Sequence, residues 1–190
     1  MRQQKPLWAL ALLLVLGVSA CRSPQPQPPA EPERRPDVIF VPTPQEVVDA
    51  MLKLAKVTKN DVIYDLGSGD GRIPITAAKT YGARAIGIDI DPQRIKEATE
   101  NLKTAGVGDR VRFLNQDLFT TNISEATVVT LYLLPSLNVK LLPKLNKELK
   151  PGTRIVSHAF DMSADGVDRK PLETMTVNGR SIYFWTIPIQ

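Results

Sequence analysis

A glycine-rich stretch at residues 65–72 constrains the fold more than any other part of the sequence. It reads Asp65-Leu66-Gly67-Ser68-Gly69-Asp70-Gly71-Arg72. An apolar, β-favouring run precedes it at 62–64, and residues 73–79 are suited to a helix. A strand, a glycine turn and a helix in this order direct backbone N–H groups towards a ligand. Because glycine also lets a ligand approach the backbone closely, the sequence predicts a binding site at this turn.

The spacing of the glycines narrows the class of ligand. A dinucleotide fingerprint, G-x-G-x-x-G, would need a glycine at the position of Arg72, which weakens the case for an NAD-dependent enzyme. No G-x-x-x-x-G-K-[ST] motif occurs, which excludes a P-loop. A carboxylate at Asp65 would repel a pyrophosphate and attract an ammonium group. The pattern therefore favours a ligand that carries an amino-acid moiety.

Two further acids follow predicted strands. Asp89 ends the apolar run 85–88 and comes roughly 20 residues after the glycine loop, the separation at which an acid reaches ribose hydroxyls. Asp117 follows a predicted strand at 111–115. Three successive strand ends that each carry an acid indicate a nucleoside-type site. The alternative interpretation is that the three acids are solvated loop caps.

These stretches, 65–72, 87–92 and 115–119, resemble the motifs of class I S-adenosylmethionine (SAM) methyltransferases. The resemblance covers about residues 42–160. It implies SAM as the cofactor and a seven-stranded, mainly parallel, Rossmann-like doubly wound α/β sheet with a C-terminal antiparallel hairpin. The cofactor-binding residues that it implies are Asp65, Gly67, Ser68, Gly69, Asp70, Gly71, Asp89, Ile90, Asp117 and Leu118.

One branch of that class is more similar still. The runs 41–44 and 131–135, with the full 65–72 stretch, resemble small protein-lysine methyltransferases, including the mitochondrial enzymes that act on the adenine nucleotide translocase and on the ATP synthase c-subunit. The resemblance implies N-methylation of a protein lysine. Two alternatives stay open: a small-molecule methyltransferase, and a non-catalytic lipoprotein that binds SAM or a nucleoside.

The catalytic residues are less clear from the sequence. Tyr132 is a candidate for orienting an amine by its hydroxyl or ring face, or else a core residue. His158, the only histidine, is a candidate base or a structural residue. The motif [DNS]-P-P-[YFW] of amino-group DNA methylation is absent at 133–136. One histidine and one cysteine make a zinc site improbable, and no metal is expected.

The N-terminal region is expected to be separate from the domain. Residues 1–20 have the basic start and short apolar run of a signal peptide, and they end in a lipobox-like sequence before Cys21, the sole cysteine. Proline-rich residues 22–37 predict an extended linker, and the domain is expected at 38–190. These features predict a bacterial lipoprotein, lipid-anchored through Cys21 in the cell envelope and facing the periplasm. The alternative is an uncleaved membrane anchor with the domain in the cytoplasm.

The remaining elements alternate in type. Helices are expected at about 44–56, where Thr43 and Glu46 form a capping box, and at 73–81, 92–105 and 137–149. Strands are expected at 83–88, 127–133 and 153–158, and Asn178-Gly179 predicts a hairpin between 174–177 and 181–186. The formal net charge of +4, with acids and bases evenly mixed, favours no nucleic-acid partner.

Overall fold

The computed structural model describes Pro36 and residues 39–163 and 167–190. The expected signal peptide, Cys21 and almost all of the expected linker lie outside the described residues. Eleven elements follow one another in this part of the chain: α1 (Gln45–Leu54), β1 (Val62–Leu66), α2 (Arg72–Tyr81), β2 (Arg84–Asp89), α3 (Pro92–Ala105), β3 (Val111–Asn115), β4 (Val128–Leu131), α4 (Pro135–Glu148), β5 (Arg154–His158), β6 (Glu173–Val177) and β7 (Arg180–Thr186). No described helix is long and apolar enough to cross a membrane.

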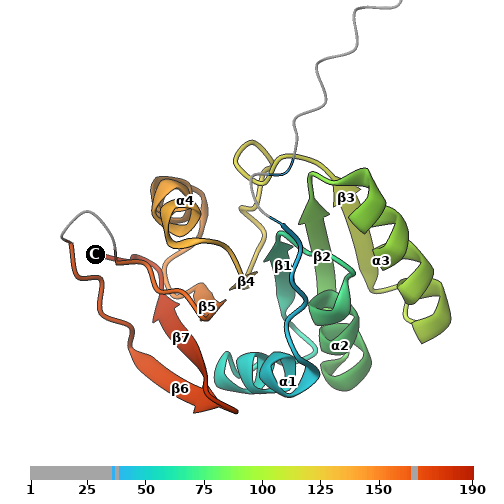
Figure 1. Ribbon diagram of the computed structural model, residues 1–190, viewed down its shortest axis with the longest axis horizontal. Helices are drawn as coiled ribbons and strands as arrows, with labels where there is room; N and C mark the ends of the chain where they lie inside the picture. The colour runs from blue at the N-terminus through green and yellow to red at the C-terminus, as the bar shows by residue number, and fades with distance from the viewer. Residues whose placement is uncertain (1–35, 37–38, 164–166) are drawn as a thin grey trace, which may run out of the picture. The chain divides into compact units, whose positions relative to one another are not determined.

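The seven strands form one sheet in the order β3-β2-β1-β4-β5-β7-β6 (Figure 1). Strands β1 to β5 are parallel, and β7 pairs antiparallel with both β5 and β6. The expected doubly wound sheet and its C-terminal hairpin are therefore confirmed. Asn178 and Gly179 form the hairpin turn with positive φ angles of 48° and 75°, as the Asn-Gly signal predicts.

Helices cover both faces of the sheet. Alternate side chains of β1 enter different cores, as the two-residue period of a strand requires: Ile63 packs with α1 and α2, and Tyr64 packs with α4. Strand β1 lies between β2 and β4, so the strands that follow it in the chain are added first on one side of it and then on the other. A strand order that diverges in this way opens a crevice at the carboxyl ends of the central strands, where ligands of α/β folds bind.

Two helix starts differ from the sequence expectation. Helix α4 begins at Pro135, two residues earlier than expected, because proline is well suited to the first helical position. The predicted capping box of α1 is wrong: Pro44 is the N-cap residue, and no side chain of the described part of the chain caps the helix. The hydroxyl of Thr43 instead lies 3.1 Å from Nδ1 of His158, which is 115 residues further along the chain.

Candidate functional site

The glycine loop between β1 and α2 is shaped by close neighbours. The backbone N–H groups of Gly67 and Ser68 both donate to the carbonyl of Ile88, which joins the loop to β2. Gly71 has a φ of +80°, and a Cβ there would collide with the ring of Phe113. Glycine at this position therefore lets the start of α2 pack closely against β3.

Asp65 lies almost fully buried at the carboxyl end of β1, with 3% of its surface exposed. Its Oδ1 accepts a hydrogen bond from the Thr130 hydroxyl at 2.6 Å. Burial raises the pKa of Asp65 to about 7; the Thr130 bond lowers it, and the charges of Asp89 and Asp70 raise it further. A buried carboxylate with one hydrogen bond is a strong attractor for a cationic group, because such a group would replace its lost hydration.

Asp89 is placed by the loops around it. Its two carboxylate oxygens accept from the backbone N–H groups of Gly69, at 2.8 Å, and Asp91, at 2.9 Å. Burial raises the pKa of Asp89 despite these bonds. Asp117, beyond β3, accepts from the N–H of Phe119 at 2.8 Å. The three acids thus meet at one edge of the sheet, as the sequence predicts.

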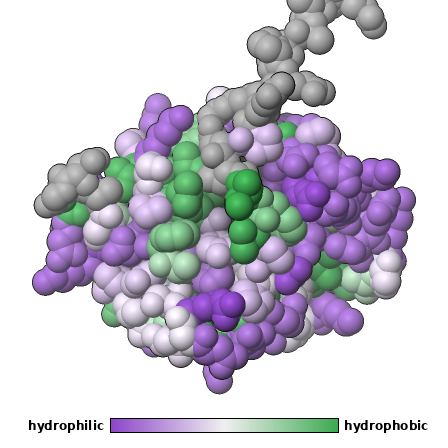
Figure 2. Space-filling view, viewed as in Figure 1, coloured by the Kyte–Doolittle hydropathy of each residue, from purple (hydrophilic) through white to green (hydrophobic). Residues whose placement is uncertain are grey.

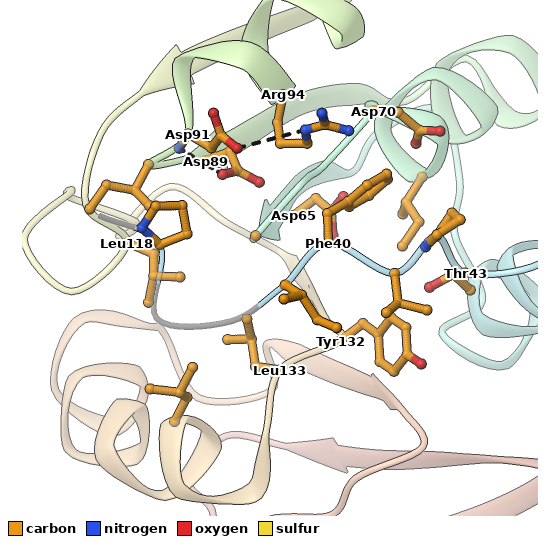
Figure 3. Close-up of a pocket in the computed structure, with 18 of the residues that line it drawn as sticks. Phe40, Thr43, Asp65, Asp70, Asp89, Asp91, Arg94, Leu118, Tyr132 and Leu133 are labelled. Carbon is orange, nitrogen blue, oxygen red and sulfur yellow. Dashed lines mark hydrogen bonds and ion pairs between the residues drawn. The ribbon is translucent and has the colours of Figure 1, made fainter. Parts of the chain in front are cut away.

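These acids line one pocket with a cavity volume of about 120 Å³ (Figure 3). Of the ten expected cofactor-binding residues, seven line it: Asp65, Gly67, Asp70, Asp89, Ile90, Asp117 and Leu118. Ser68, Gly69 and Gly71 are absent from the lining. Ser68 is buried, and its hydroxyl has no hydrogen-bond partner among the described residues. The cofactor assignments of all ten positions stay predictions.

An N-terminal segment, residues 39–43, contributes to the pocket, and sequence reasoning missed the part at 39–41. Its Phe40 ring packs on Gly69 so closely that a Cβ there would overlap it. The guanidinium of Arg94 lies over the same ring, 4.8 Å from its centroid (Figure 3). Ile39, Phe40 and Val41 are all exposed, and Figure 2 shows apolar side chains gathered on the viewed face. No local pattern marks the role of Phe40, because it depends on contacts with distant elements.

Arg72 connects this segment to the glycine loop. Its Nη1 donates to the Thr43 carbonyl at 2.7 Å, and its Nε and Nη2 donate to the two carboxylate oxygens of Asp70. The hydrogen bonds to Asp70 raise the pKa of Arg72, so its guanidinium stays protonated. The residue that breaks the dinucleotide fingerprint therefore holds the N-terminal segment across the pocket.

The catalytic candidates occupy different positions. Tyr132 lines the pocket, whereas His158 is 1% exposed and is not part of the lining. The rings of Tyr132 and His158 are 4.0 Å apart between centroids. Burial lowers the pKa of His158 to about 4, and the charge of Arg180 lowers it further, so the imidazole is neutral near pH 7. His158 thus lies behind Tyr132 and does not face the cavity.

The donor set fits SAM. Asp65 offers a buried anion for its ammonium group, Asp89 offers carboxylate oxygens for ribose hydroxyls, and Ile90 and Leu118 offer apolar surface for adenine. Among the described residues, no group of three or more histidine, cysteine or acidic side chains is placed to hold a metal ion.

A family model, the ANTKMT methyltransferase domain, matches residues 65–168. The chain belongs to this family. A protein-lysine N-methyltransferase of Saccharolobus islandicus is 52% identical over 128 residues, which cover 67% of this chain and 80% of that protein. The human lysine N-methyltransferase named for the ATP synthase c-subunit is 29% identical over 121 residues, and the chain spans about half of its length.

Solved structures support the same assignment. An RNA methyltransferase of Salinibacter ruber, crystallised with S-adenosyl-L-homocysteine, is 57% identical with a TM-score of 0.74. The match covers 79% of this chain and 95% of that one. The protein is thus a SAM-dependent methyltransferase, as the sequence motifs predict.

Proposed function

We propose that this methyltransferase transfers the methyl group of SAM to the side-chain amine of a protein lysine. The observation that carries the proposal is the division of the pocket into two chemically different ends. Asp65, Asp89 and Asp117 lie at the cofactor end. Figure 3 shows Tyr132 and Leu133 on the side away from Asp89 and Asp91.

The acceptor end suits a lysine side chain. Tyr132 and its chain neighbour Leu133 line the pocket, and its uncharged, apolar lining also includes Val41, Pro42 and Leu137. Such surface packs against the four-carbon stem of a lysine. The face of the Tyr132 ring is attractive to an amine that gains positive charge.

The reaction needs a neutral amine. SAM supplies an electrophilic methyl group on a sulfonium. The amine nitrogen forms the new N–C bond while the C–S bond breaks, and the electron pair of that bond stays on sulfur. An apolar site lowers the pKa of an entering lysine, because desolvation disfavours its charged form. The chain therefore contributes desolvation and orientation, and the lysine proton leaves to solvent before transfer.

The relatives favour a protein acceptor. The Saccharolobus islandicus, human and mouse relatives are named for lysine N-methylation. The Salinibacter ruber protein is described as an RNA methyltransferase, so RNA is included as a competing acceptor in the test.

The test uses the purified chain with SAM that carries a labelled methyl group. It is offered proteins and RNA extracted from cells that lack the gene. Label on lysine Nζ, mapped by mass spectrometry and lost when that lysine is replaced by arginine, supports the proposal. Label that is removed by ribonuclease, or that stays in the small-molecule fraction, contradicts it.

We also propose that the chain is a lipoprotein of the bacterial cell envelope, anchored through lipid on Cys21. The support is the sequence alone: a basic start, a short apolar run and small residues before the sole cysteine. Incorporation of labelled fatty acid that is lost in Cys21→Ser supports this proposal. A membrane-bound but unlabelled chain, with the domain protected from external protease, supports the alternative of a cytoplasmic domain on an uncleaved anchor.

A further inference from the structure

The hydroxyl of Thr43 makes a tertiary contact where a helix cap is expected. Thr43 is 4% exposed, and its Oγ1 lies 3.1 Å from His158 Nδ1. Because α1 has no side-chain cap, the start of that helix forgoes a contribution of about 1 kcal/mol. The hydroxyl instead joins the N-terminal segment to the end of β5.

The chain after His158 is held in a strained turn. Ala159 has a φ of +65°, and the N–H of Phe160 donates to the His158 carbonyl at 2.8 Å. A three-residue turn with this sign of φ is rare in proteins and unfavourable for a residue with a Cβ. The hydroxyl of Ser157 and the amide of Asn138 stabilise it by donating to the carbonyls of Phe160, at 2.6 Å, and Asp161, at 3.1 Å.

This turn places two rings behind Tyr132. The Tyr132 ring is stacked with the Phe160 ring, with 6.2 Å between the ring centroids and an interplanar angle of 19°. The centroid of the His158 ring is closer, 4.0 Å from that of Tyr132. We call Tyr132, His158 and Phe160 the acceptor wall. Only Tyr132 of the three lines the pocket, so the other two act on a substrate through it. Strain that is kept by several hydrogen bonds is characteristic of functional sites.

Thr43 therefore connects the two ends of the pocket. Its carbonyl accepts from Arg72 of the glycine loop, and its hydroxyl contacts His158 of the acceptor wall. The same residue lines the cavity. A change in the His158 contact would shift the N-terminal segment and the Tyr132 ring together.

We propose that His158 is a positioning residue of methyl transfer, which acts through its hydrogen bond to Thr43 and its contact with the Tyr132 ring. This pair of contacts sets the distance between the acceptor amine and the cofactor end of the pocket. The inference rests on the proposed lysine acceptor. A neutral imidazole fits the role, because a charged one beside Tyr132 would repel the cationic product amine.

The kinetic test compares two variants of Thr43. Thr43→Val keeps the shape but loses the hydroxyl, and Thr43→Ser keeps the hydroxyl. The acceptor is a synthetic peptide that carries the lysine mapped in the labelling experiment. Thr43→Val is expected to lower kcat at least about tenfold with a SAM Kd within about twofold of the wild type, and Thr43→Ser to recover most of the rate. Thr153→Val, a buried change outside the pocket lining, serves as the control and is expected to leave the rate unchanged.

A second readout needs no activity. His158 is the only histidine, so its imidazole nitrogens are identified in an NMR spectrum without assignment. The wild type is expected to show one neutral tautomer, and Thr43→Val a mixture of two. If the wild type is active and Thr43→Val keeps both the rate and the single tautomer, the inference is overturned. The proposed function is not affected by that result. A loss of SAM affinity equal to the loss of rate also overturns the inference, because the link would then serve cofactor binding. A wild type that binds SAM but methylates no lysine overturns the proposed function, and the inference falls with it.

Discussion

Asp65→Asn should stabilise the cofactor-free protein at alkaline pH while it removes SAM binding. The carboxyl is 3% exposed, with a pKa of about 7 in place of 3.8. A difference of about 3 between folded and unfolded pKa values corresponds to about 4 kcal/mol. Asparagine keeps the shape of the side chain and can still accept the Thr130 hydrogen bond, but it has no charge to bury.

The direction in which stability changes with pH follows from the raised pKa of Asp65. Because the folded-state pKa is raised, the stability linked to Asp65 is fully present below pH 3.8 and is lost as the pH rises to about 7. About 2.5 kcal/mol of that loss falls between pH 5 and pH 8. The stability advantage of Asp65→Asn over the wild type should therefore grow by this amount over that interval.

Urea unfolding of both proteins at a series of pH values measures the difference. Thr130→Val removes the hydrogen bond that lowers the pKa of Asp65, so the loss of stability should extend to higher pH in that variant. If the free energies of unfolding of the wild type and Asp65→Asn change with pH in parallel, the buried Asp65 carboxylate does not destabilise the fold, and the reasoning is refuted. SAM should raise the melting temperature of the wild type only, because we propose that the buried carboxylate receives its ammonium group.

Three further outcomes are expected. The stability contributed by neutral His158 should be lost as the pH falls from 6.5 to about 4, by about 3 kcal/mol, so an imidazole NMR titration near pH 6.5 would contradict the burial argument. Gly71→Ala should cost about 3 kcal/mol, because its φ is +80° and its Cβ would collide with Phe113; an unchanged thermal midpoint would contradict this. Arg94→Gln should weaken SAM binding about threefold in calorimetry, because it removes both the contact with Phe40 and a positive charge near Asp89 and Asp91; unchanged affinity would contradict a role of Arg94 in the site.

The parts of the site that were predictable from the sequence are those that local chemistry fixes. Glycines at 67, 69 and 71 all have positive φ, and acids at the carboxyl ends of neighbouring parallel strands must meet at one edge. The same rules predict the sheet and its hairpin. A strand end and a glycine turn are local features, and parallel pairing then brings them together without further information.

The parts that sequence reasoning missed depend on long-range contacts. Thr43 matches a capping box perfectly at the local level, but His158 offers its hydroxyl a buried partner. Phe40 precedes α1 in a stretch without a periodic pattern. Its ring packs against Gly69 and Arg94, which are distant in the sequence. Ala159 has a positive φ because Ser157 and Asn138 stabilise the turn. An alanine in the sequence gives no sign of such a turn.

The proposed methyl transfer to lysine and the proposed role of His158 both depend on the acids at the strand ends forming a SAM site in this chain. The decisive experiment is calorimetric titration of SAM into the purified protein, beside Asp89→Ala, because Asp89 is fixed by two backbone N–H groups and lines the pocket. We expect one site of micromolar affinity in the wild type and a loss of at least about tenfold in the variant. Equal affinity in the two proteins, or no binding to the wild type, would contradict the assignment of this pocket to SAM.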